Sequence, residues 1–195
     1  MQILVILCHP LEGSFNHAVA RRASAVLAAA GHEVRFHDLY KEGFDPVMPG
    51  SEYRRGVSFD EQVVRHTQEL ASSGGLVFVH PEWWGQPPSL LKGWLDRVLR
   101  PGVAYEPADA ERAEPAPAPL LGGKSALVFA TREQAARSGL LERVWMEGVF
   151  AFCGMSGSCH VLHDLRNLAP AGRIAWLELV AETLTRAFPA SGPPD

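Results

Sequence analysis

The chain has 195 residues, a formal net charge of −4, 47% hydrophobic residues and 21% charged residues. This length and balance indicate one globular domain with a sizeable core and exclude a disordered chain. The slight acidity gives no electrostatic basis for a nucleic-acid or anionic-membrane partner, and no apolar segment is long enough to span a bilayer.

Apolar runs rich in β-forming residues alternate with helical patterns along the chain. The first run, Ile3 to Leu7, has almost no polar alternation, which is typical of a parallel strand covered on both faces. Such alternation predicts an α/β fold, a three-layer, doubly wound, five-stranded parallel sheet in the flavodoxin-like order 2-1-3-4-5. Strands are expected at residues 3–7, 33–38, 76–80, 124–131 and 159–162, and helices at 15–30, 60–73, 88–99, 140–152 and 173–188.

Three segments are expected to be irregular. Residues 45–56 and 106–119 contain several prolines, and the second of these is predicted to be a mobile loop. A single flavodoxin-like domain is expected over residues 1–188, followed by a flexible tail at 189–195.

The loop after the first strand has the features of an anion site. Ligands of open α/β sheets bind beyond the carboxyl ends of the strands, and Ser14, Phe15 and Asn16 open a helix there. The first amides of a helix have no intrahelical partner, so a phosphate can accept their hydrogen bonds, and His9 can add another. The alternative is purely structural, with Ser14 as a helix cap, Asn16 as a turn residue and His9 as the end of a strand.

Other chemistries of such a loop are excluded by spacing. Neither a GxGxxG turn nor a GxxxxGK[ST] P-loop is present. Cys8 follows the first strand, as the nucleophile of a low-molecular-weight phosphatase does, but that chemistry needs an arginine six residues later, where Ser14 stands. We find no Ser-His-Asp set, and His160 and His163 are expected to face opposite sides of a strand rather than share a metal.

A second candidate loop follows the third strand, beside the first loop. It carries Trp83 and Trp84, flanked by prolines and Gly85. Rigidly held aromatic rings near an anion site suit a flat ligand with a phosphate arm, and backbone amides from Glu82 to Gly85 can bind its edge. The alternative is that the tryptophans form a dimer contact or a small apolar cluster.

Together, the stretches CHPLEGSFNHA and HPEWWGQPPSLLKGWLDRV resemble the NAD(P)H:quinone oxidoreductase family of flavodoxin-like flavoproteins, above all its short bacterial members. The resemblance runs from residue 1 to about Tyr105 and continues more weakly beyond it. It implies a bound FMN or FAD, NAD(P)H as co-substrate, two-electron ping-pong transfer of a hydride to a quinone or similar acceptor, and a homodimer with the flavin near the interface.

The resemblance also implies roles for particular residues. Tyr105 matches an aromatic position of the substrate pocket, and with Thr131 it is expected to take part in catalysis. In the third loop Thr131 fits the family, but Arg132 and Glu133 replace its glycines, and donors such as Arg132 are expected to stabilise charge on the reduced ring. The flavin-phosphate loop and the ring-holding loop correspond to His9, Ser14, Phe15, Asn16, Pro81, Glu82, Trp83, Trp84 and Gly85.

Several alternatives stay open at this point. The altered third loop also fits a degenerate domain that binds flavin weakly or not at all, and some relatives are ancillary subunits of potassium-efflux systems. An azo dye or a nitroaromatic can replace the quinone. FMN is favoured over FAD because no adenine pocket can be read from the short chain, and NADH is not distinguished from NADPH.

The cysteines point to the cellular compartment. Cys8, Cys153 and Cys159 are odd in number and lie in apolar segments, so reduced thiols and a cytoplasmic protein are expected. Met1-Gln2 leads straight into the first strand, without the basic region of a secretory leader.

Overall fold

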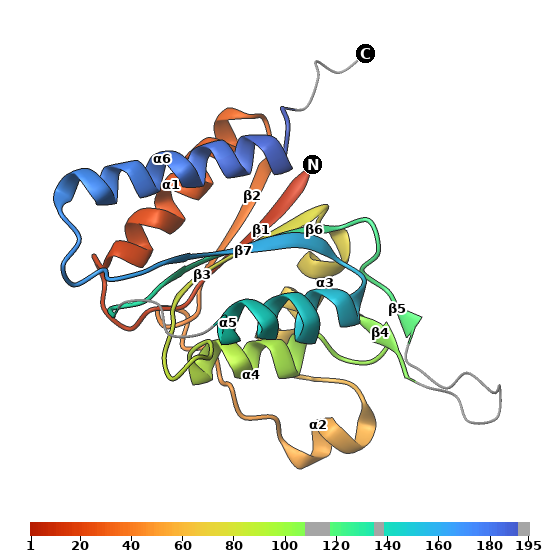
Figure 1. Cartoon of the computed structure of the whole chain (residues 1–195). Coiled ribbons are helices and arrows are strands. Elements are labelled where there is room, and N and C mark those ends of the chain that lie inside the picture. Colours follow the sequence, from red (N-terminus) through yellow and green to blue (C-terminus); the bar gives the residue numbers. More distant parts are fainter. Residues whose placement is uncertain (108–117, 135–138, 191–195) are drawn as a thin grey trace.

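The computed structural model describes residues 1–107, 118–134 and 139–190. The predicted tail at 189–195 therefore lies mostly outside the described residues, as does the greater part of the predicted loop at 106–119. Within the described part, a central sheet is covered on both faces by helices, which confirms the predicted three-layer α/β fold (Figure 1).

The central sheet has five strands, and all of its pairings are parallel. In chain order the strands are β1 (Gln2–Leu7), β2 (Glu33–Asp38), β3 (Gly75–Pro81), β6 (Ser125–Thr131) and β7 (Ser156–Leu162). Their order across the sheet is β2-β1-β3-β6-β7, which is the predicted flavodoxin-like order when the strands are counted along the chain. A separate antiparallel pair, β4 (Tyr105–Glu106) and β5 (Ala118–Pro119), lies at the end of the sheet where its strands begin (Figure 1).

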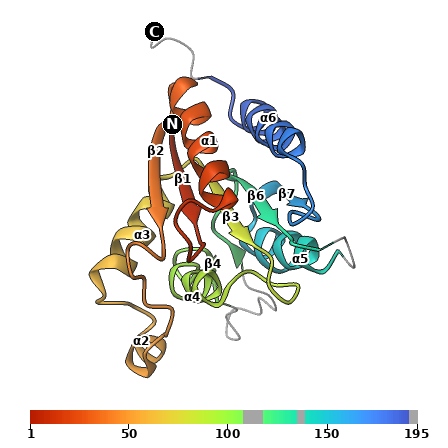
Figure 2. The ribbon, with the colours of Figure 1, turned by 90° about the vertical axis from the view of Figure 1, so that its left-hand side faces the viewer.

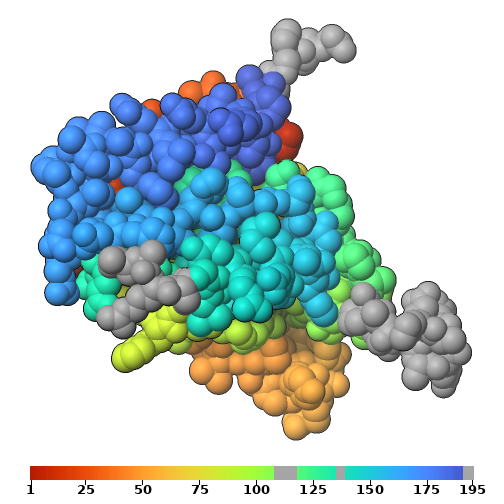
Figure 3. Space-filling model, viewed as in Figure 1, coloured from red at the N-terminus to blue at the C-terminus, as the bar shows by residue number. Residues whose placement is uncertain are grey.

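The helices lie in two layers. On one face, α1 (Phe15–Ala29) packs against α6 (Pro170–Ala187), and Figure 2 shows the two side by side. The other face is covered by α3 (Glu61–Ser72), α4 (Ser89–Val98), α5 (Leu140–Arg143) and the π-helix η1 (Val144–Ala151). The short α2 (Gly50–Arg55) projects from this side, and in Figure 3 its atoms form a protrusion below the body of the domain.

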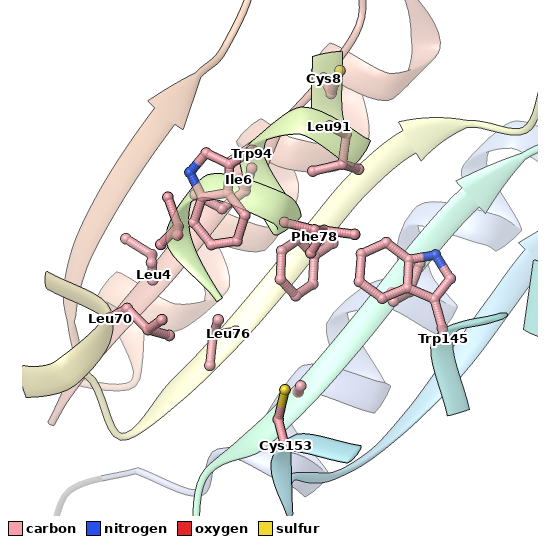
Figure 4. Close-up of a cluster of buried hydrophobic side chains, with 14 of the residues drawn as sticks. Leu4, Ile6, Cys8, Leu70, Leu76, Phe78, Leu91, Trp94, Trp145 and Cys153 are labelled. Atoms are coloured by element: carbon pink, nitrogen blue, oxygen red, sulfur yellow. The ribbon is translucent and has the colours of Figure 1, made fainter. Parts of the chain in front are cut away.

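Alternate side chains of each strand enter two separate cores. Ile3, Val5 and Leu7 of β1 face the α1 and α6 layer, whereas Leu4 and Ile6 face the α3 and α4 layer. All five are fully buried, as the unbroken apolar run predicts. Figure 4 shows the second core, in which Phe78 of β3 lies between the indoles of Trp94 and Trp145.

Two segments differ from the sequence-based expectation. Residues 45–56, predicted to be irregular, contain the helix α2, and the predicted helix at 140–152 is one turn of α-helix followed by the π-helix η1. The helix α2 is stabilised by contacts with a residue that is distant in the sequence. Arg97 of α4 is buried and donates from Nη2 to Glu52 at 2.8 Å and from Nη1 to the carbonyl of Asp45 at 2.7 Å.

Candidate functional site

The carboxyl ends of three neighbouring strands define the candidate site. The amide of Cys8, just past β1, donates to the carbonyl of Val79 in β3 at 2.9 Å. The amide of Glu82, just past β3, donates to the carbonyl of Thr131 at the end of β6 at 2.7 Å. The loops after β1 and β3 therefore start side by side, as predicted, and the third loop starts next to them.

The first loop ends in a capped helix. The Ser14 hydroxyl accepts from the backbone amide of His17, and the Ser14 amide donates to the carbonyl of Leu11. Ser14 is therefore the N-cap of α1, which confirms the structural alternative for this residue. The amides of Phe15 and Asn16 have no partner among the described residues, so this helix end retains the donors that an anion needs.

His9 is in a state suited to donating a hydrogen bond. Its Nδ1 accepts from the amide of Leu11 at 3.1 Å, so the neutral ring carries its proton on Nε2. Partial burial lowers the pKa of His9 below its ordinary value, which keeps the ring neutral around pH 7. A neutral Nε2–H beside the helix end can donate to an anion without bringing a fixed charge.

Asn16 links the first loop to the third. Its Nδ2 donates to the Thr131 hydroxyl at 2.9 Å, and both residues are buried. The other amide atom, Asn16 Oδ1, is buried and has no partner among the described residues. A buried acceptor without a donor costs about 1–3 kcal/mol, and a hydroxyl-bearing ligand at this helix end can supply that donor.

The second loop is a tight turn with two residues at positive φ. Trp83 and Gln86 exchange both backbone hydrogen bonds at 3.0 Å, and the residues between them, Trp84 and Gly85, have φ of 56° and 76°. The Trp84 side chain is fully exposed. At Gly85 the positive φ favours glycine, whereas the nearest atom to an added Cβ is Leu140 Cδ2 at 2.8 Å, the end of a flexible side chain that can move aside.

The turn corrects one expectation about the second loop. Four amides, from Glu82 to Gly85, were expected to be available to a flat ligand. Two are already used within the protein, since Glu82 donates to Thr131 and Trp83 donates to Gln86. In the described structure the amides of Trp84 and Gly85 remain without a partner, so ring binding through this backbone depends on them.

Glu82 and Arg132 form a buried ion pair between the second and third loops. The side chains are each 9% exposed, and Arg132 Nε donates to Glu82 Oε2 at 2.6 Å, with a second contact from Nη2. The guanidinium also lies 3.3 Å from His163 Nδ1, just past β7. A positive charge is thus fixed beside Thr131, although residues 135–138 of this loop lie outside the described part.

Tyr105 is not brought to this edge of the sheet within one chain. It lies in β4, paired with Pro119, at the end of the sheet where the strands begin (Figure 1). A seven-residue strand is about 20 Å long, which separates Tyr105 from the strand ends at Thr131. Its ring packs edge-on against Phe152, with centroids 4.9 Å apart.

Sequence reasoning missed a hydrogen-bonded Ser-His-Asp line in the first loop. Ser14 Oγ lies 2.8 Å from His17 Nδ1, and His17 Nε2 lies 3.2 Å from Asp38 Oδ2. Asp38 comes from the end of β2, so the parallel pairing of β1 and β2 supplies the contact. A cavity of about 380 Å³ opens beside this line, and its wall includes Leu7, Glu12, Gly13, His17, Arg21, Phe36, Asp38 and Lys41.

A second polar cluster was also missed. His37, Glu42 and His66 place potential ligand atoms within 4.8 Å of one another. Trp94 Nε1 donates to His66 Nδ1 at 2.8 Å, so the His66 proton sits on Nε2 and points to Glu42 at 3.2 Å. That proton occupies the lone pair that a metal would need, so we interpret the cluster as a hydrogen-bonded one.

The three cysteines are free thiols, as expected. Burial raises the pKa of Cys8 and of Cys159 to about 12 and that of Cys153 to about 11. Thiols that stay protonated at neutral pH are poor nucleophiles, which agrees with the exclusion of phosphatase chemistry at Cys8. Among the helices of the described residues, none combines the length and apolar character needed to cross a bilayer.

Comparison with known proteins defines the class. Residues 1–176 match a family model described as a flavodoxin-like fold, so the chain belongs to that family. An uncharacterized NAD(P)H oxidoreductase of Haemophilus influenzae is 28% identical over 193 residues, which cover 93% of both chains. NAD(P)H dehydrogenase (quinone) 1 of Rattus norvegicus is 29% identical over 122 residues, 52% of this chain but only 44% of that enzyme.

Solved structures agree on the fold. An FMN-dependent NADH-azoreductase of Bacillus anthracis, solved in complex with FMN, has a TM-score of 0.77 at 16% identity and covers 97% of this chain and 99% of its own. This likeness shows the fold alone. The family match and the sequence relatives confirm the resemblance to the NAD(P)H:quinone oxidoreductases and, at the level of its class, an NAD(P)H dehydrogenase (quinone)-like enzyme.

Proposed function

We propose that this chain binds FMN and transfers electrons from NAD(P)H to a quinone. The observation that carries the proposal is the pairing of two features at adjacent strand ends. One is the α1 terminus, where the amides of Phe15 and Asn16 have no partner within residues 1–107, 118–134 and 139–190, and the other is the turn that exposes Trp84. The first suits a phosphate and the second a flat ring.

The residues of the first loop would hold the phosphate arm. The amides of Phe15 and Asn16 and the Nε2–H of His9 are donors, and Asn16 Oδ1 is the acceptor for a hydroxyl of the ribityl chain. FMN is favoured over FAD because the single phosphate of FMN would be enough to engage these donors. The FMN-bound azoreductase of the same fold supports that choice.

The second and third loops would hold the ring. NAD(P)H would give a hydride to the bound flavin and leave, and a quinone would then take two electrons at the same place. The amides of Trp84 and Gly85 bind the ring edge, and Trp84 covers a face. Arg132, held by Glu82 next to Thr131, offsets the negative charge that reduction adds.

A homodimer is part of the proposal. Tyr105 lies at the far end of the sheet in its own chain, so it can reach a substrate pocket only through a second copy. It lines a cavity of about 400 Å³ between α2, α4 and η1, whose wall also includes Tyr53, Leu95, Val149 and Phe152. Light scattering that gives twice the chain mass supports this, whereas a monomer that retains full activity contradicts it.

The proposed activity is tested with the purified protein and FMN. The absorbance bands of bound FMN are expected to bleach with NADH or NADPH under nitrogen and to return on addition of benzoquinone. The same trial with an azo dye decides whether the acceptor class is that of the azoreductase relative instead. Protein that stays colourless after incubation with FMN and FAD contradicts the proposal and favours the degenerate domain, and bound flavin that NAD(P)H does not reduce favours an ancillary role.

A further inference from the structure

The Ser14, His17 and Asp38 line has a defined proton arrangement. An ionised Asp38 carboxylate can only accept, so the neutral His17 ring must carry its proton on Nε2, where Asp38 Oδ2 lies 3.2 Å away. His17 Nδ1 is then a bare acceptor. The contact of 2.8 Å from Ser14 Oγ is therefore a hydrogen bond that Ser14 donates.

This arrangement removes a donor from the candidate phosphate site. While the Ser14 proton points to His17, it cannot point to an anion at the end of α1. When His17 takes up a second proton, Nδ1–H becomes the donor and Ser14 Oγ the acceptor. The hydroxyl proton of Ser14 is then free to turn towards the ligand.

We propose that His17 and Asp38 are positioning residues that link phosphate binding at α1 to the uptake of one proton. The inference rests on the proposed function and deepens it. The proton is taken from solvent onto His17 Nδ1, no covalent bond to the ligand forms or breaks, and the Ser14 hydroxyl keeps its own proton while changing its acceptor. Neither His17 nor Asp38 needs to touch the phosphate.

The surroundings of His17 allow such a proton. The His17 side chain is 10% exposed and borders the cavity of about 380 Å³, which gives solvent access. In the described part of the chain, the charged groups that face it are the carboxylates of Asp38 and Glu12 and the cations Arg21 and Lys41, and the titratable but neutral ring of His9 packs edge-on at 6.2 Å. A bound phosphate adds negative charge beside Ser14 and therefore favours the protonated ring.

Calorimetric titration with FMN in two buffers of different ionisation enthalpy measures the protons taken up. We expect the wild type to take up as much as one proton per FMN, and its affinity to fall by up to about tenfold per pH unit wherever that uptake is measured. Riboflavin, which lacks the phosphate, is expected to bind without this uptake. The ionisation of the phosphate itself is common to every variant and cancels in their comparison.

Two variants separate the proposed link between FMN binding and proton uptake, called the relay below, from a purely structural role of His17 and Asp38. His17→Asn keeps a polar partner for Ser14 but cannot titrate, so the His17-dependent proton uptake is expected to vanish. Asp38→Asn keeps the shape and the bond from the Lys41 amide, and it allows neutral His17 to carry its proton on Nδ1. Ser14 is then free at every pH, so this variant should bind FMN at high pH about tenfold or more tighter than the wild type.

The outcomes are distinguishable. Equal proton uptake by the wild type and His17→Asn, or a wild-type pH profile in Asp38→Asn, overturns the relay while leaving FMN binding intact. Absence of FMN binding by the wild type at any pH overturns the relay and the proposed function together. Thermal unfolding of both variants establishes that they are folded at the titration temperature.

Discussion

Trp84 holds a backbone conformation that a tryptophan rarely adopts. Its φ of 56° lies in the left-handed region, which costs a residue with a side chain about 1–2 kcal/mol, and its fully exposed indole regains nothing by packing. A strained, exposed aromatic residue at a strand end is typical of a binding site. The sequence predicted the aromatic loop, but the positive φ depends on the hydrogen bonds between Trp83 and Gln86.

Trp84→Asn separates binding from stability. Asparagine tolerates positive φ, so the free energy of unfolding is expected to stay the same or rise by about 1 kcal/mol. FMN affinity is expected to fall about tenfold because the stacking surface is lost. Phe59→Ala, which removes an exposed ring elsewhere, is the control and should leave FMN affinity unchanged. A Trp84→Asn variant with wild-type affinity contradicts the assignment.

The Glu82 and Arg132 pair predicts a large effect from a single change. Glu82→Gln removes one buried carboxylate partner of the Arg132 guanidinium, and we expect a loss of about 3 kcal/mol in the free energy of unfolding measured with urea. Asp96→Asn breaks the pair with Lys92, whose side chains are half exposed, and should cost less than about 0.5 kcal/mol. Similar losses in the two variants would show that the Glu82 pair is not buried in solution.

At the scale of elements, the strands were the most predictable part. The fully apolar runs of β1, β3 and β6 are buried on both faces, so their sequence carries the signal of their position. The helix α2 was missed because it begins after Pro49 and contains Gly50, and because its anchor is the distant Arg97. The local sequence of this six-residue polar segment gives no sign of its contact with Arg97.

Arg97 is therefore expected to stabilise the segment that contains α2. Arg97→Met leaves the buried carboxylate of Glu52 without its cation, with the Ser58 hydroxyl still donating to it, so the free energy of unfolding should fall by about 3 kcal/mol. Adding Glu52→Leu removes that orphaned charge and should restore part of the loss in a double-mutant cycle followed by urea unfolding. Strictly additive losses would mean that the two side chains do not interact.

At the scale of the whole molecule, the fold brings together groups that are distant in sequence. Glu42 follows β2, whereas His66 belongs to α3. Although burial acts in the opposite direction, the hydrogen bonds of His37 and His66 hold the pKa of Glu42 well below its ordinary value. Bonds to Glu42 and Glu69 likewise overcome burial and raise the pKa of His37. The hydrogen-bonded line of Ser14, His17 and Asp38 likewise joins residues from separate elements, so it could not be predicted from the spacing of residues along the chain. The same holds for the distance of Tyr105 from the strand ends.

The pH dependence of stability follows from the sign of the Glu42 shift. A depressed carboxyl pKa stabilises the fold at pH values above the unfolded value of 4.5, and this contribution is lost as the pH falls through the folded pKa. Glu42→Gln should cost about 2 kcal/mol near pH 7, and the difference from the wild type should shrink below about pH 4. Glu33→Gln, at an exposed pair with Arg35, is the control and should show no such trend. A Glu42→Gln deficit that does not change with pH contradicts the assignment.

The central claim is that the loops at two adjacent strand ends bind the two ends of FMN. The phosphate binds at α1, and the ring binds at the Trp84 turn. This claim is tested most directly by titrating the purified protein with FMN and with riboflavin and following the quenching of flavin fluorescence. The account predicts one FMN per chain with a dissociation constant below about 1 μM and at least tenfold weaker binding of riboflavin. Equal affinities for the two flavins, or no binding of either, would contradict it.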